Sequence, residues 1–469
     1  MSTTDTSIVT NTGNNFGSFG YRSFVLWTLT IVYTFNFIDR ILISVMGGPI
    51  IAEFGLSNFE FGILSGIGFA LFYTMLGIPI ANFSERHNRV RIIGICVILW
   101  SLATVLCGFA TGFVTLLLAR LLVGIGEAGC TPPANSLISD YYKPVARPTA
   151  LGIYAMGVTA GGVLAQLGGG WVIQNFTWRE AFIYVGAPGI IIGILVLLTI
   201  KEPPRGYSDP PTTKSASQTN FKDAIVEIFS KPTFWIMAVG ATLAAFAGYG
   251  LVGFTPLFIQ YVHGYSAGET AIMFMAPVGL AATLGAFLGG YLTQTASKKS
   301  ETAPTWVSGI AFLIAVPFYA FSFFASDHRL MLAMLMLGSV LQYFYIGAQY
   351  NIAQAVVSVR SRATAVAVLL FVVNLIGYGF GPPIIGLMAD IFASNQLASG
   401  EFAGTLSSSC NFADASLSEA AQSACRAAKG YGIQMACVAA TVLFALAGLF
   451  FLISGRTFVR DRYVSEPAT

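Results

Sequence analysis

The chain has 469 residues, of which 55% are hydrophobic and only 10% are charged, and its mean hydropathy is +0.73. Soluble domains carry about 25% charged residues, so this composition excludes them and predicts a polytopic integral membrane protein. The net charge of +3 is too small to indicate a nucleic-acid partner.

Residues 1–22 are rich in Ser, Thr, Asn and Gly and contain no apolar core of the kind that signal peptides have. We therefore expect them to form a short cytoplasmic tail.

Twelve apolar runs follow, each long enough to cross a bilayer, which takes about 20 residues of helix. Strand-like alternation is absent from these runs, so an all-α membrane protein is predicted rather than a barrel. The runs cover residues 24–50, 60–83, 91–110, 112–138, 148–174, 180–200, 232–261, 268–295, 304–325, 330–357, 363–391 and 430–454.

The basic residues set the expected orientation. If both termini are cytoplasmic, the inner segments hold 18 of the 24 Lys and Arg residues, and the outer loops hold four. Inner loops of membrane proteins are enriched in basic residues, so this orientation is the predicted one. The remaining two, Arg40 and Arg120, lie within predicted spans. We expect the protein in a plasma or bacterial inner membrane.

The only long inner connection divides the chain into six spans and six spans. Residues 201–231 begin with a Pro-rich linker, and FKDAIVEIF (221–229) is typical of an amphipathic helix on the inner surface. The predicted parts are a bundle over 23–200, this linker, a bundle over 232–455 and a cytoplasmic tail over 456–469. RPTALGIY (147–154) and RATAVAVL (362–369) repeat between the bundles, and such repeats are typical of transporters.

A long outer loop is predicted over 393–429. Ser416 and Glu419 have the spacing of a capping box for a short helix. Cys410 and Cys425 both lie in this loop, on the oxidising side of the membrane, and a disulfide between them is a hypothesis that the sequence leaves open.

Four ionisable residues lie deep within the spans: Asp39 and Arg40 on the first, Arg120 and Glu127 on the fourth. Each charge at the bilayer centre costs at least about 2.5–3.5 kcal/mol, so the four must pair or line a water-filled cavity. Counting the rise along each helix predicts Asp39–Arg120 as the closer pair and Arg40–Glu127 as the looser one.

These four charges sum to zero, which suggests a mechanism that couples substrate binding to proton binding. An anionic headgroup must compete with a carboxylate for an arginine, and protonating Asp39 or Glu127 frees that arginine. The alternative is that the charges only hold two helices in register. The second bundle offers polar and aromatic side chains instead, and the possible cavity-lining residues are Asn36, Tyr345, Gln349 and Asn374. Such a cavity suits an amphiphile.

These features together resemble the major facilitator superfamily and, within it, the Spinster family. The inner loop NFSERHNRVR (82–91) resembles the superfamily signature, with Arg86 and Arg89 in place and Glu85 where the signature has Asp. ARLLVGIGEAGCTPPANSLISDYY (119–142) and NLIGYGFGPPIIGLMAD (374–390) also look like that family.

The resemblance implies twelve helices in two pseudo-symmetric bundles and alternating access. It implies transport of lysolipids or sphingoid phosphates, often linked to protons, with Asp39, Arg40, Arg120 and Glu127 as the matched substrate and proton residues. It also implies a cytoplasmic gate in which Glu85 meets the N-terminus of the eleventh helix, and we expect Asp140 to pair with Arg86 or Arg89. The fifth span lacks the proline of the antiporter signature, so the direction of proton coupling stays open.

We therefore predict a secondary transporter of an amphipathic, lipid-like molecule, without a cofactor or metal, that works as a monomer among membrane lipids. A drug or small organic-anion carrier of the same fold is the first alternative. A lipid enzyme is a further alternative, but His87, His263 and His328 are scattered and no nucleophile–base pair is evident.

Overall fold

The computed structural model describes residues 18–208, 221–400, 402, 405–407, 410, 414 and 416–463. All regular secondary structure in these ranges is helical, and twelve segments are long and apolar enough to cross a membrane. The prediction of an all-α, twelve-span membrane protein is confirmed. Most of the tail predicted over 1–22 and part of the linker lie outside the described residues.

The first six spans are α1 (Phe19–Val45), α3 with α4 (Asn58–Ser65, Ile67–Ser84), α5 (Arg89–Gly108), α6 with α7 (Phe113–Glu127, Thr131–Tyr141), α8 (Arg147–Asn175) and α9 (Trp178–Thr199). The short helix α2 (Gly47–Phe54) follows α1, and α10 (Phe221–Phe229) lies in the connection between the halves.

The last six spans are α11 (Pro232–His263), α12 with η3 and α13 (Ala267–Glu269, Thr270–Met275, Ala276–Ser297), α14 (Ala303–Phe324), α15 with α16 (His328–Gln342, Tyr345–Ala355), α17 with η5 and α18 (Arg362–Val372, Val373–Tyr378, Gly379–Ala398) and α19 (Glu419–Asp461). The short 3₁₀ turn η4 (Val359–Ser361) precedes α17.

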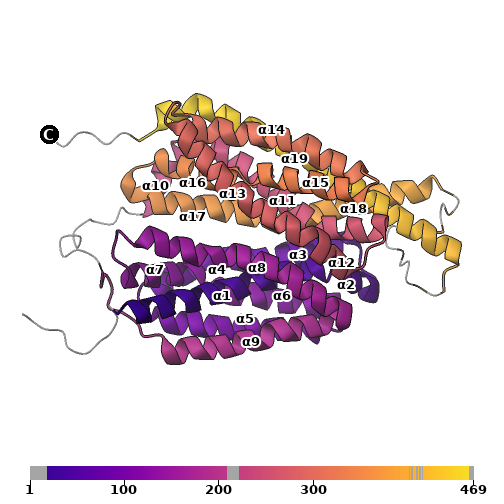
Figure 1. Cartoon of the computed structure of the whole chain (residues 1–469), viewed down its shortest axis with the longest axis horizontal. Helices are drawn as coiled ribbons and strands as arrows, with labels where there is room; N and C mark the ends of the chain where they lie inside the picture. Colours follow the sequence, from indigo (N-terminus) through magenta and orange to yellow (C-terminus); the bar gives the residue numbers. More distant parts are fainter. Residues whose placement is uncertain are drawn as a thin grey trace, which may run out of the picture.

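The two sets of six spans form two bundles that lie side by side (Figure 1), which we call the first and second half. Helices α2, α3 and α12 lie at one end of the molecule, the distal end, while α10 and the C-terminal end of α19 lie at the other, the terminal end (Figure 1). At the distal end α3 contacts α18, and α8 contacts α12 and η3, so the halves are closed together there. At the terminal end Glu85, Arg86, Arg360 and Arg362 are exposed.

The predicted outer loop is shorter than expected because both flanking helices extend into it. Helix α18 continues to Ala398, and α19 begins at Glu419, where the Ser418 hydroxyl caps it by accepting from the amide of Ala421. The capping residue is therefore Ser418 rather than Ser416, and it opens the last span instead of a separate short helix. A disulfide joins Cys410 to Cys425, with the two Cα atoms 6.1 Å apart.

Helix α10 is attached to the second half by one carboxylate. Glu227 accepts hydrogen bonds from the amide and hydroxyl of Ser358, at 2.5 and 2.9 Å, and from the hydroxyl of Ser361, at 2.5 Å. Burial alone would raise the pKa of Glu227, but these hydrogen bonds outweigh burial and hold its pKa below the usual range. Glu227 therefore anchors the connection to the turn that opens α17.

This anchor gives a pH-dependent contribution to stability. Because the folded-state pKa of Glu227 is depressed, its contribution is full above the unfolded-state value of about 4.3 and is lost as the pH falls through the folded-state value. We expect Glu227→Gln to lower the thermal unfolding midpoint in detergent at pH 7, and this difference from wild type to vanish in acid. Asp223→Asn, an exposed change on the same helix, is the control; an equal effect of both variants, or a difference that grows in acid, would contradict the anchor.

Candidate functional site

The four deep charges gather between α1 and α6, and the predicted pair Arg40–Glu127 is present, but it is the closer pair and not the looser one. Arg40 Nε lies 2.8 Å from Glu127 Oε2, and the Glu127 side chain is completely buried. Arg120 instead donates from Nη1 to the backbone carbonyl of Asp39, at 3.4 Å. The predicted order of the two pairs is therefore wrong. Counting residues fixes the depth of a side chain but not its direction around the helix, and the long Arg40 side chain reaches Glu127 directly.

Glu127 occupies the end of a broken helix. Helix α6 ends at Glu127, and α7 begins at Thr131, with two prolines in its first turn. A proline has no amide hydrogen and cannot continue a helix behind it, so Pro132 and Pro133 favour the break. Broken spans at mid-membrane depth occur in transporters where they border a binding site.

Aromatic rings surround the Arg40 guanidinium. Its central carbon lies 4.2 Å from the ring centre of Tyr73 and 4.9 Å from those of Phe37 and Phe69. Cation–π contacts of this kind stabilise a charge that has left water. They also hold the guanidinium in place at the edge of the first half, facing the second half.

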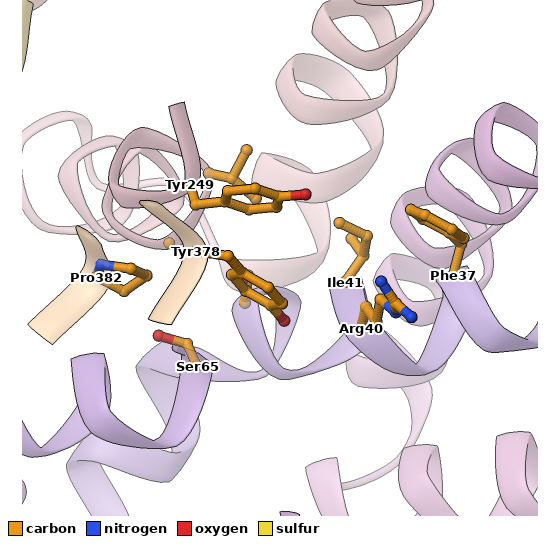
Figure 2. A pocket seen from close by; sticks show the side chains of 10 residues that line it. Phe37, Arg40, Ile41, Ser65, Tyr249, Tyr378 and Pro382 are labelled. Carbon is orange, nitrogen blue, oxygen red and sulfur yellow. The ribbon is translucent and has the colours of Figure 1, made fainter. Parts of the chain in front are cut away.

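A cavity of about 30 Å³ lies beside Arg40 between the two halves, which is room for one or two water molecules. Figure 2 shows Phe37, Arg40 and Ile41 facing Tyr249 and Tyr378, with Ser65 and Pro382 close by. The rings of Tyr249 and Tyr378 stack with their centres 4.3 Å apart. In this conformation the cavity is lined by aromatic rings on the side of the second half.

Several buried polar atoms in this cluster have no hydrogen-bond partner among the described residues. They are Arg120 Nε and Nη2, Arg40 Nη2, Asp39 Oδ1, Glu127 Oε1 and both side-chain heteroatoms of Asn36. Leaving a buried charged donor unsatisfied costs more than about 1–3 kcal/mol. A cluster that retains such atoms is suited to bind a polar or ionic group.

The other predicted lining residues are not among those that line this cavity. The Tyr345 ring packs in the core of the second half, 5.2 Å from the ring of Phe312, which corrects its expected place. Gln349 is buried on α16, and Asn374 is half-buried in η5. Tyr249 and Tyr378 line the cavity instead. Tyr378 stands in the NLIGYGFG motif, whereas Tyr249 lies in a small-residue run, AGYGLVG, that gave no signal.

The residues predicted for the cytoplasmic gate divide into two groups. Arg89 is fully buried and bonds Asp140 and Glu202, the latter at 2.6 Å, and all three belong to the first half and its connection. Glu85 and Arg86 are exposed at the terminal end. Asp140 thus pairs with Arg89, one of its two expected partners, and no salt bridge joins the two halves through these four residues in the part of the chain that the structure describes.

No grouping of three or more His, Cys, Asp or Glu side chains suitable for a metal ion is found in the described ranges. The site consists of the charged quartet of Asp39, Arg40, Arg120 and Glu127, and of the rings around it.

Residues 29–382 match the Major Facilitator Superfamily. A solved bacterial homologue of the human lysosomal transporter Spinster, in an inward-facing and unoccupied conformation, is 41% identical, with a TM-score of 0.86; the match covers 96% of this chain and 100% of that one. An "MFS-type efflux pump" of Mycolicibacterium smegmatis is 29% identical over 77% of this chain and 83% of its own length. The sphingosine-1-phosphate transporter SPNS2 of Danio rerio is 24% identical over 91% of this chain and 82% of its own.

The burial of the Arg40–Glu127 pair leads us to predict how its loss changes the free energy of unfolding. Glu127→Ala leaves Arg40 buried without its counter-ion, and breaking a buried pair in this way costs about 3–5 kcal/mol. We expect the free energy of unfolding in mixed micelles to fall by that amount. The double variant Arg40→Met with Glu127→Leu removes both charges and should recover most of the loss. A single variant as stable as wild type would show that the pair is solvated and not buried.

Proposed function

This chain belongs to the Major Facilitator Superfamily and, within it, to the Spinster family, and we propose that it transports an anionic or zwitterionic amphiphile of the lysophospholipid or sphingoid phosphate type. A transporter of this family is an integral membrane protein that exposes one site to each side of the membrane in turn.

The observation that carries the proposal is the incompletely bonded Arg120. Its side chain is 1% exposed, and its Nε and Nη2 have no partner among the described residues. A guanidinium presents paired N–H groups that match the oxygens of a phosphate or carboxylate. Arg120 beside Arg40 is thus a receptor for an anionic headgroup within the bilayer.

The cavity wall on the side of the second half, opposite Arg40, supports an amphiphile rather than a fully polar solute. Tyr249 and Tyr378 present ring faces from the second half, and Val252 and Pro382 complete that wall. Such rings accept an alkyl chain and offer hydroxyls near its polar end. The named activity of the zebrafish relative, transport of sphingosine-1-phosphate, agrees with this reading.

The same residues link transport to protons. A headgroup that binds Arg40 displaces Glu127 from its cation, and the displaced carboxylate then binds a proton more readily. Proton binding and substrate binding are thereby coupled through one site, whichever way the substrate moves.

The resting geometry supports an orientation and a gate. We propose that the terminal end faces the cytoplasm and that the structure is inward-facing, as the solved homologue is. Glu85 and Arg86, which are exposed here, then meet the second half when the terminal end closes. We propose a monomer in the plasma or bacterial inner membrane.

A drug or small organic-anion carrier is the competing proposal, favoured by the similarity to an efflux pump. Such a carrier would use the same arginines without needing an alkyl-binding wall. The two proposals differ in whether a chain longer than the headgroup is required.

We expect proteoliposomes to take up a labelled lysophospholipid or sphingoid phosphate, and a pH gradient to change the rate. Arg120→Ala should lower uptake by about ten- to a hundredfold, the effect of losing a charge-assisted hydrogen bond. Arg329→Ala, an exposed arginine at the distal end, is the matched control and should leave uptake unchanged. Uptake of short dicarboxylates in place of the lipid would favour the competing carrier and contradict the amphiphile.

The carboxylate of Glu127 should carry the pH response. Glu127→Gln keeps a hydrogen-bond acceptor for Arg40 but cannot bind a proton in this range, so transport should become independent of pH while the protein stays folded. Uptake measured from pH 5.5 to 8.5, with size-exclusion profiles as a check on folding, tests this. A variant with the wild-type pH profile would remove Glu127 from the coupling mechanism.

A further inference from the structure

One carboxylate, that of Asp390, joins the two halves at the distal end. Asp390, on α18, accepts hydrogen bonds at Oδ1 from the amide and the side-chain amide of Asn58, at 3.1 and 2.8 Å, and at Oδ2 from the amide of Phe59, at 2.9 Å. All three donors belong to the first turn of α3, in the first half. Asp390 is 8% exposed. The second half thus supplies an N-terminal cap to a helix of the first half.

This cap adds to what α3 provides for itself. Ser57 and Glu60 form a capping box in which Ser57 Oγ accepts from the amide of Glu60, leaving the amides of Asn58 and Phe59 for another acceptor. A negative charge at a helix N-terminus is stabilised by the helix dipole, and hydrogen bonds to a carboxylate are about twice as strong as neutral ones. Lys429, a buried residue of α19, interacts electrostatically with the same carboxylate.

The backbones of α3 and α18 are in close contact at the distal end. The hydrogen bonds of Asp390 depend on this close approach. A Cβ placed on Gly386 would lie 2.2 Å from the Asn58 carbonyl oxygen, and one placed on Gly62 would lie 2.5 Å from that of Pro382. The hydrogen bonds of Asp390 therefore form only when the distal ends of α3 and α18 are in contact, and they are lost when the distal end opens.

We propose that Asp390 is the latch of the distal gate, a positioning residue that holds the inward-facing state by capping α3 across the interface. It touches neither the central cavity nor the charged quartet. Asp390 acts on the equilibrium between inward- and outward-facing states, and through that equilibrium on access to the central site. The proposal rests on alternating access, but not on the identity of the substrate.

The test replaces the charge and measures distal access without any substrate. In Asp390→Asn, an amide group takes the place of one carboxylate oxygen and faces the helix N-terminus, so the latch loses its charge at nearly constant volume. The reporter is Val252→Cys, which lines the central cavity, labelled by a membrane-impermeant maleimide from the distal side. We expect labelling to become about 5- to 30-fold faster, the shift that corresponds to about 1–2 kcal/mol.

Asp327→Asn is the matched control. Asp327 also caps a helix, accepting from the amides of Arg329 and Leu330, but both donors lie in its own half, so labelling should stay at the wild-type rate. Asn58→Ala removes one of the three donors and should speed labelling to a smaller extent, which tests the latch even if Asp390→Asn fails to fold. Wild-type labelling rates in Asp390→Asn and Asn58→Ala, or an equal increase in Asp327→Asn, would overturn the latch and leave the proposed substrate untouched.

Discussion

The rest of the site depends on the burial of the Arg40–Glu127 ion pair in a membrane-spanning bundle. Two isolated charges at this depth would each cost several kcal/mol, so neither helix can hold its charge without the other. The pair joins α1 to the break between α6 and α7, and three aromatic rings contact the guanidinium. Once Glu127 is committed to Arg40, Arg120 is left with a backbone carbonyl as its one hydrogen-bonded partner among the described residues. The four charges thus sum to zero, but several of their polar atoms have no hydrogen-bond partner among the described residues.

In the mechanism proposed above, these unsatisfied atoms make the site responsive. An anion that enters would take hydrogen bonds from an arginine, and a proton on a carboxylate would release an arginine, so each ligand would change the binding of the other by the same factor. The contacts between the two halves at each end of the molecule decide from which side the site can be reached. At the distal end, glycine-lined contacts between α3 and α18 bring Asp390 onto the first turn of α3. At the terminal end the residues of the proposed gate are exposed, which is the arrangement expected while the site is accessible from that side.

The sequence predicted the spans well because each must present about 20 apolar residues to lipid, a requirement visible in any window of the chain. It also placed the charges of Asp39, Arg40, Arg120 and Glu127 within the spans, where the structure brings them together. It paired Arg40 with Glu127, as the structure does, but it did not predict that this pair is the closer one, since rotation about the helix axis depends on packing that a linear count does not contain. Tyr345 and Tyr249 show the same limit: both are tyrosines within spans, yet one packs in the core of its half and the other lines the cavity. Asp390 ends a recognised motif, but its partner is 332 residues away.

The central claim is that substrate and proton meet at one buried cluster, and calorimetry tests it most directly. Purified protein would be titrated with a lysophospholipid below its micelle concentration, in two buffers of different ionisation enthalpy at the same pH. If the headgroup displaces a carboxylate from its arginine, binding takes up as much as about one proton, and the observed heats differ between the buffers in proportion. Saturable binding with identical heats in both buffers would show that no proton accompanies the substrate, and would contradict the account.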